Sequence, residues 1–189
     1  GRELPAFRYD QGEGYDYFDA SGQSLRKAFL KAPVEFSRIS SRYNLKRFHP
    51  ILQKTKAHYG TDYAAPQGTP IISVGDGVVS KSSYTKGNGK YVKIRHNNTY
   101  ETQYLHMSRR AVAAGERVKQ GQVIGYVGST GLATGPHVCF RFWKNGKQVD
   151  HLREEFPPST PIKDDQMDAF QAAIQEINEA ITGLSSVAK

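Results

Sequence analysis

The sequence predicts a mainly β fold of antiparallel strands with one helix near its C-terminal end. From residue 67 to residue 150, short stretches of alternating apolar and polar side chains are separated by turns, and no helical pattern interrupts them. From residue 164 to residue 184, apolar residues instead recur at steps of three and four, which is typical of an amphipathic helix. Because strands that succeed one another without helices pair side by side, we expect an antiparallel sandwich or barrel and then that helix.

The composition agrees with a globular, turn-rich and basic protein. Of the 189 residues, 38% are apolar and 23% are charged, and the chain holds 18 glycines and 9 prolines. No run of about 18 apolar residues occurs, so a membrane span is not expected. The net charge of +8 suits an anionic partner such as a cell-wall polymer. Nucleic acid is not expected as a partner, because like charges form no long block and there is no RNA-binding signature.

Three segments succeed one another along the chain. Residues 1–34 form a lead-in with short aromatic strands and too few apolar residues to fold alone, so we expect it to pack on the strand-rich domain after it or to belong to an upstream domain. Residues 35–155 hold the strand-rich domain, and residues 156–189 hold a linker and the helix. No signal peptide is visible at the first residues, so an exported protein would have lost its targeting segment.

One predicted strand carries side chains suited to metal binding or proton transfer. From residue 137 to residue 143, valine and phenylalanine alternate with His137, Cys139 and Arg141. The apolar set is expected to face the core and the polar set the opposite face, and Asn145-Gly146 predicts a tight hairpin turn after the strand. Cys139 is the single cysteine of the chain, which excludes an intramolecular disulfide.

Two further positions offer residues of the same chemistry. His58 and Asp62 lie in a loop or short strand, because a glycine and a proline argue against a helix there. His106 ends an alternating stretch in which it is expected to share a face with Tyr104. Zinc is bound by histidine nitrogen, cysteine thiolate and carboxylate oxygen, and catalytic zinc sites leave one position to water. Taken separately, each of these groups is more often a surface hydrogen bond than a metal site.

Three blocks of the sequence resemble, in order and in separation, the motifs of lysostaphin- and LytM-type zinc endopeptidases. Residues 58–70 resemble the motif HxGxDxxAxxGTP, and residues 104–108 resemble the YxHLS-like segment. Residues 128–137 resemble the beginning of the segment GxTGxxTGPHxHF. The resemblance covers about residues 35–155, and residues 17–34 also resemble the segment that precedes the catalytic domain in Gram-negative members.

This resemblance implies a lysostaphin-like fold of the duplicated-hybrid type, with two antiparallel sheets forming a groove and one Zn²⁺ per chain at its floor. His58 and Asp62 would be zinc ligands. His106 and His137 would be catalytic residues that orient water, move protons and steady the oxyanion. The implied reaction is the hydrolysis of peptide bonds in peptidoglycan cross-links or stem peptides. The implied location is the periplasm or cell envelope, with a possible association with the membrane or envelope through an N-terminal region that this sequence lacks.

Cys139 is where the sequence departs from the family's pattern, which has histidine at this third ligand position. Three interpretations are open: a thiolate zinc ligand, a non-ligand in a degenerate site, or a small buried residue. The polar residues that share its face, together with the otherwise intact motifs, favour the ligand. If Cys139 is a bystander, His49 is the first residue to test as the missing ligand.

Several other residues have candidate roles. Tyr63, Tyr104 and Arg141 are candidates to line the substrate groove. His96 is expected in the core or at its edge, and His151 is expected to be solvated.

Two other functions remain open at the level of the sequence. The first is a metal-free protein of the same fold that binds the cell wall or activates another wall hydrolase, a hypothesis that Cys139 alone supports. The second is a basic binder of nucleic acid or a surface polymer, for which only the net charge speaks.

Overall fold

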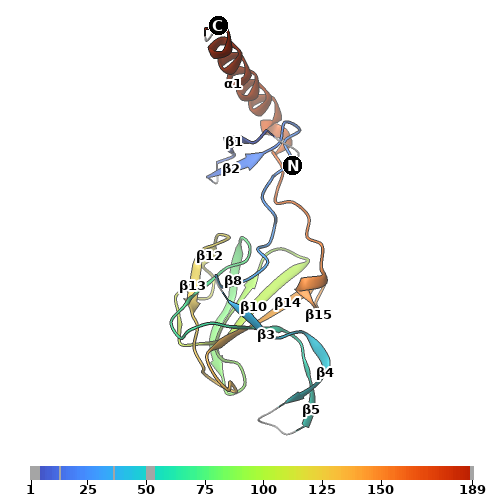
Figure 1. Cartoon of the computed structure of the whole chain (residues 1–189), viewed down its shortest axis with the longest axis vertical. Helices are drawn as coiled ribbons and strands as arrows, with labels where there is room; N and C mark the ends of the chain where they lie inside the picture. The colour runs from blue at the N-terminus through green and yellow to red at the C-terminus, as the bar shows by residue number, and fades with distance from the viewer. Residues whose placement is uncertain (1–4, 13, 36, 50–53, 188–189) are drawn as a thin grey trace. The chain divides into compact units, whose positions relative to one another are not determined.

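The computed structural model describes residues 5–12, 14–35, 37–49 and 54–187, and the chain forms two compact units (Figure 1). One unit joins Gly1–Ala28 to Phe156–Lys189, and the other comprises Phe29–Glu155. The predicted lead-in of residues 1–34 is therefore divided: its part up to Ala28 shares a unit with the C-terminal helix, and residues 29–34 belong to the larger unit. None of the helices in the described residues combines the length and apolar character that a membrane span requires.

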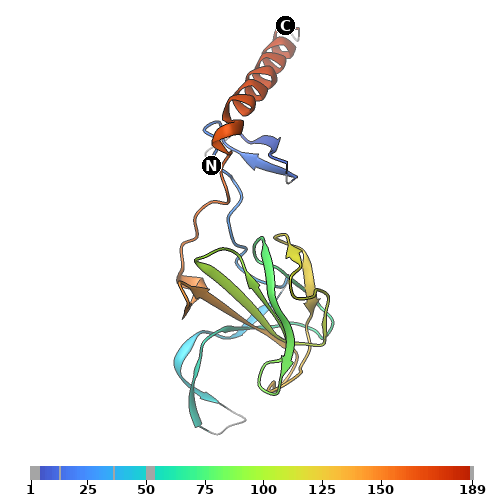
Figure 2. The same ribbon diagram turned by 180° about the vertical axis from the view of Figure 1, so that it is seen from behind.

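The larger unit is built on antiparallel sheets, as the strand pattern predicts (Figure 2). Its main sheet has eight strands, in the order β12-β8-β9-β10-β14-β6-β3, with β15 paired to β14. These strands are β3 (Arg38–Ser41), β6 (Thr61–Ala64), β8 (Gly77–Thr85), β9 (Gly89–Arg95), β10 (Tyr100–Met107), β12 (Arg117–Val118), β14 (His137–Lys144) and β15 (Lys147–Val149).

Two smaller sheets and a short helix complete this unit. A three-stranded sheet has the order β11-β13-β7, with β7 (Pro70–Ile72), β11 (Arg109–Arg110) and β13 (Val123–Tyr126). A hairpin pairs β4 (Asn44–His49) with β5 (Lys54–His58). A 3₁₀ turn, η1 (His151–Arg153), comes after β15.

The alternation predicted for β14 is confirmed. Val138, Phe140 and Phe142 are buried, and the ring centroid of Phe140 lies 5.3 Å from that of Tyr104 on the neighbouring strand β10. Buried residues of both larger sheets make up the core, among them Ile71, Val79, Ile94, Ile124 and Val127. The hairpin turn after β14 has φ values of 50° at Asn145 and 76° at Gly146, the left-handed conformation that a two-residue hairpin loop requires.

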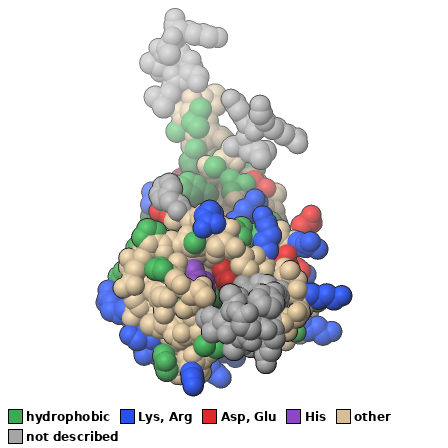
Figure 3. Space-filling model, turned by 60° about the horizontal axis from the view of Figure 1, so that its bottom comes forward, with side chains coloured by type: hydrophobic (Ala, Val, Ile, Leu, Met, Phe, Trp, Pro, Cys, Tyr) green, Lys and Arg blue, Asp and Glu red, His purple; other side chains and the backbone are tan. Residues whose placement is uncertain are grey.

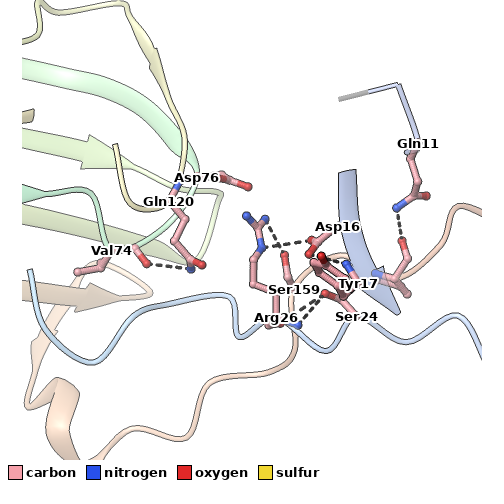
Figure 4. A network of polar contacts seen from close by, with 10 residues as sticks. Gln11, Asp16, Tyr17, Ser24, Arg26, Val74, Asp76, Gln120 and Ser159 are labelled. Carbon is pink, nitrogen blue, oxygen red and sulfur yellow. Dashed lines mark hydrogen bonds and ion pairs between the residues drawn. The ribbon is translucent and has the colours of Figure 1, made fainter. Parts of the chain in front are cut away.

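The smaller unit packs a hairpin against the C-terminal helix. The hairpin pairs β1 (Phe7–Asp10) with β2 (Tyr15–Phe18), and a 3₁₀ turn, η2 (Asp164–Gln166), leads into α1 (Met167–Val187). Its buried cluster comprises Phe18, Ile162, Phe170 and Ile174. The guanidinium of Arg26 adds polar contacts, 3.2 Å from Asp16 Oδ2 and 3.2 Å from Ser159 Oγ (Figure 4). The lead-in, which has too few apolar residues to fold alone, thus shares a core with the helix.

Candidate metal centre

Three neighbouring strands bring His58, Asp62 and Cys139 together. Asp62 on β6 and Cys139 on β14 stand directly opposite each other in the antiparallel pairing, which places their side chains on the same face of the sheet. His58 ends β5, and its Nε2 lies 3.0 Å from Asp62 Oδ1 and 3.5 Å from Cys139 Sγ. One ligand atom from each residue lies within 4.8 Å of the others, and all three side chains are buried.

The orientation of His58 determines which atoms face the site. Its Nδ1 lies 3.0 Å from the carbonyl oxygen of Arg42, and because a carbonyl can only accept, Nδ1 carries the proton. The lone pair of Nε2 is therefore directed at the Asp62 carboxylate and the Cys139 sulfur. A nitrogen, an oxygen and a sulfur atom thus converge on one small space, where a single cation could bind all three. This donor set fits zinc.

The two acidic groups of the site respond to burial in different ways. Burial opposes ionisation of Asp62, but its interactions with His58, His137 and Cys139 outweigh this effect and lower the pKa of the carboxyl group to about 2. Burial and the nearby Asp62 raise the pKa of the Cys139 thiol to about 12, against the lowering effect of Arg141. Without a metal the thiol is therefore protonated at neutral pH, and metal binding to the sulfur must release this proton.

His106 and His137 lie beside these three residues. Their ring centroids are 4.8 Å apart, and His137 Nε2 lies 3.9 Å from Asp62 Oδ1. Each Nδ1 lies 2.8 Å from a backbone carbonyl, that of Thr130 for His106 and that of Gly135 for His137. Both rings are thus held with the proton on Nδ1 and the Nε2 lone pair free for chemistry. Burial lowers the pKa of His106 to about 4, so this ring is neutral at pH 7.

An irregularity of strand β10 turns His106 toward the site. The backbone of His106 has a φ of +64°, and the β9–β10 register shifts between Tyr104 and Met107. The predicted shared face of Tyr104 and His106 is therefore wrong, because a bulge interrupts the alternation. Leu105 packs on Cys139, so two consecutive residues, Leu105 and His106, both approach the site. A non-glycine residue held at positive φ beside a candidate site is a common sign of function.

Two of the predicted groove residues belong to the interior instead. Tyr104 is fully buried, and its hydroxyl accepts a hydrogen bond of 3.0 Å from the Val74 N–H. Tyr63 is also buried, and its hydroxyl lies 2.8 Å from His151 Nε2. Neither tyrosine is free to line a groove, since each alternates away from the polar face of its strand. His151 is likewise buried and not solvated, because it packs under Tyr63 and Phe140.

The remaining candidates divide between the interior and the site. His96 is half-buried and bonds to the carbonyl of Asp76 and the hydroxyl of Thr102, in agreement with a position at the core edge. Arg141 is half-buried on β14, one step along the same face from Cys139. The side chain of His49 lies outside the described residues.

Sequence reasoning missed the carbonyl groups that hold the three histidines. A backbone carbonyl has no side-chain signature, so the contributions of Arg42, Thr130 and Gly135 were not predictable from residue type. One indirect signal exists at Gly89, whose φ is +63°. A Cβ there would lie 2.2 Å from the carbonyl oxygen of Thr130, so only glycine allows the Thr130 loop to come close enough to reach His106.

His137 and Asp62 are the residues through which the site is partly exposed at the molecular surface. The side chain of His137 is 15% exposed and that of Asp62 is 11% exposed. Figure 3 shows one face of the molecule, on which a histidine side chain and an acidic side chain lie close together at the surface. The side chains of both His137 and Asp62 are therefore partly in contact with solvent.

The matched family and relatives agree with this geometry. The model of peptidase family M23 matches residues 56–151, which contain all five residues of the site. Peptidoglycan DD-endopeptidase ShyC of Vibrio cholerae is 47% identical over 172 residues, which cover 91% of this chain and 40% of that protein. The chain thus spans less than half the length of this relative.

Two solved structures with similar folds are named as peptidases. A zinc-containing peptidase from Vibrio cholerae superposes with a TM-score of 0.66 at 38% identity, covering 82% of this chain and 47% of that chain. The catalytic domain of lysostaphin from Staphylococcus simulans superposes with a TM-score of 0.55 at 27% identity, covering 61% of this chain and 90% of that one. The predicted mainly β, lysostaphin-like fold is confirmed.

Proposed function

Because this chain belongs to peptidase family M23, we propose that it is a zinc-dependent endopeptidase that hydrolyses peptide bonds of peptidoglycan. The observation that carries the proposal is the convergence of His58 Nε2, an Asp62 carboxylate oxygen and Cys139 Sγ within 4.8 Å of one another. Three protein donors of this kind leave a fourth position open, which is the composition of a catalytic rather than a structural zinc site. We assign one Zn²⁺ per chain to these three residues.

A zinc ion held by His58, Asp62 and Cys139 would supply Lewis-acid chemistry: it would polarise the scissile carbonyl and lower the pKa of a water molecule, so that hydroxide is available as the nucleophile. The chain's own contribution begins with holding the donors. His58 is fixed by the Arg42 carbonyl, and Asp62 and Cys139 are fixed by the pairing of β6 with β14. Cys139 takes the position that histidine has in the family's pattern, and it brings a negative charge that imidazole lacks.

His106 and His137 are proposed as the catalytic residues that handle protons. Each presents the lone pair of Nε2, since its Nδ1 donates to a carbonyl at 2.8 Å. His106 is neutral at pH 7 and can accept a proton from the attacking water at Nε2. A ring protonated in that step can then donate the proton to the leaving amine or hydrogen-bond the oxyanion. The 4.8 Å separation of the two rings lets both act on one small group of reacting atoms.

A substrate in the wall implies action in the cell envelope. We propose the periplasm or envelope as the location and peptidoglycan as the partner. The net charge of +8 favours approach to an anionic envelope polymer. Association with a membrane remains a prediction from the sequence alone.

The test combines metal analysis with digestion of purified peptidoglycan, read by mass spectrometry of the released fragments. We expect about one zinc per chain and fragments that differ by cleavage of a single peptide bond. Asp62→Ala is the matched control, which should lose both zinc and activity because it removes a ligand. Peptidoglycan binding without zinc and without cleavage would contradict the proposal and favour the metal-free wall-binding protein.

A further inference from the structure

The face of the main sheet that carries Asp62 and Cys139, here called the site face, continues beyond the metal centre as a row of polar residues. Gln103 on β10 stands opposite Arg141 on β14 and opposite Lys93 on β9. Side chains directly opposite in neighbouring strands point to the same side of the sheet. Arg141 lies two residues after Cys139, so it stands about 7 Å farther along the site face. Two cations thus lie in the row next to the ligand Cys139.

The two cations of this row differ in how their charges are compensated. Lys93 Nζ lies 2.8 Å from Glu101 Oε2 and 4.7 Å from the centroid of the Trp143 ring, so its charge is already paired. Arg141 forms no ion pair with the described residues, and its buried Nε finds no hydrogen-bond acceptor among them. Within the described residues, Arg141 therefore has no carboxylate partner, and its Nε–H is left without an acceptor.

The position of Arg141 is built into the fold rather than left to a mobile side chain. A Cβ at Gly60 would lie 3.0 Å from Arg141 Cγ and 3.1 Å from Cys139 Sγ. Glycine at this position makes room for the aliphatic part of Arg141 against the strand. The guanidinium is consequently held next to the metal centre and not swung into solvent.

We propose that Arg141 binds a carboxylate of the peptide substrate, within about two residues of the bond that is cut. A guanidinium presents planar paired donors that match a carboxylate, and this match makes arginine a selective carboxylate binder. An extended peptide spans about 3.5 Å per residue. The distance of about 7 Å between Cys139 and Arg141 along the strand therefore corresponds to about two residues of the substrate. The position of the carboxylate relative to the cleaved bond rests on the proposed function. Binding of the carboxylate itself does not require hydrolysis.

The experiment compares the affinities of short peptides for the zinc-loaded protein by isothermal titration calorimetry. The peptides end in two D-alanine residues joined by an N-methylated bond, which slows hydrolysis, and they carry either a free C-terminal carboxylate or an amide. A third peptide has the amide and a glutamate as its third residue from the end, so that a side-chain carboxylate is distinguished from a terminal one.

Two substitutions identify the residue responsible. We expect the wild-type protein to bind at least one carboxylate peptide about 10-fold more tightly than the neutral amide. Arg141→Gln should abolish this preference, Arg141→Lys should keep part of it, and the matched control Lys93→Gln should leave it intact. Zinc content is measured for every variant, and it should stay at the wild-type level because none of the substituted side chains is a ligand.

Several results would overturn the inference. These are equal affinity of the wild-type protein for all three peptides, no measurable binding of any of them, or an unchanged preference in Arg141→Gln. Loss of zinc in Arg141→Gln without loss of the preference would instead identify Arg141 as a partner of the Cys139 sulfur. A retained preference in a protein that fails to digest peptidoglycan would contradict the proposed function and leave the carboxylate site standing.

Discussion

Acidification should destabilise the larger unit through His151, a residue that the fold holds in its neutral form. Its side chain is buried beneath Phe140, with the ring centroids 4.7 Å apart, and its Nε2 lies 2.8 Å from the Tyr63 hydroxyl. Burial lowers the pKa of His151 from 6.5 to about 4, with Asp150 opposing the shift. The unfolded chain therefore takes up this proton at a higher pH than the folded chain does.

The sign and size of the effect are set by this difference in pKa. Because the folded pKa is lowered, the stability that neutral His151 contributes is present above pH 6.5 and is lost as the pH falls toward 4. Between pH 7 and pH 5 the loss is about 2 kcal/mol, and its limit at lower pH is roughly 3 kcal/mol. His151→Gln removes the titration while keeping a side chain that can hydrogen-bond the Tyr63 hydroxyl.

The assay is urea unfolding in the presence of a chelator, which removes the separate pH dependence of metal binding. Fluorescence of Trp143, the single tryptophan of the chain, reports on the larger unit. The wild-type protein should lose about 2 kcal/mol more than His151→Gln between pH 7 and pH 5, since all other titrating groups are common to both. Equal losses in the two proteins would mean that His151 is protonated or hydrated in the folded state, contrary to its assignment as a buried neutral ring.

Three further predictions concern the site and the smaller unit. Cys139→Ser should lose most of the zinc, whereas Cys139→His should retain it; zinc content is measured after dialysis. Full zinc content in Cys139→Ser would show that the thiol is not a ligand. His106→Ala and His137→Ala should each lower peptidoglycan hydrolysis by at least about 100-fold while zinc content is unchanged, and loss of zinc in either would disprove its assignment as a non-ligand. Phe170→Ala should cost the smaller unit about 3–5 kcal/mol by opening its core, visible as earlier loss of helical circular dichroism; an unchanged midpoint would show that this cluster does not hold the unit together.

Local sequence patterns correctly predicted the orientation of side chains where the strands are regular. Alternation along β14 placed Cys139 and Arg141 on one face and the phenylalanines on the other, and the same rule applied to β6 would have separated Tyr63 from Asp62. The motifs supplied the identity of the candidate ligands, and the structure brings those side chains within 4.8 Å of one another. Cys139 is buried, and its sulfur lies 3.5 Å from His58 Nε2, so burial alone does not separate the interpretations that the sequence leaves open. Its role as a zinc ligand stays a prediction.

The failures arose where the backbone departs from a regular strand or where burial depends on distant segments. Because His106 has a positive φ, its side chain points to the opposite side of the sheet from the one that alternation predicts. The neighbouring residue types give no indication of a β-bulge. His151 comes after the last strand, yet Tyr63 and Phe140, far away in the sequence, close over it. A tertiary contact of this kind is invisible to a reading of local periodicity.

The bond between the Cys139 sulfur and zinc can be measured by X-ray absorption at the zinc edge. The protein is loaded with one equivalent of zinc, freed of excess metal and compared with Cys139→His as the matched control. We predict one sulfur at about 2.3 Å in the wild-type protein, with the other ligands being nitrogen or oxygen at about 2.0–2.2 Å, and no sulfur in the control. A wild-type spectrum fitted by nitrogen and oxygen alone would contradict the assignment of Cys139 as a zinc ligand.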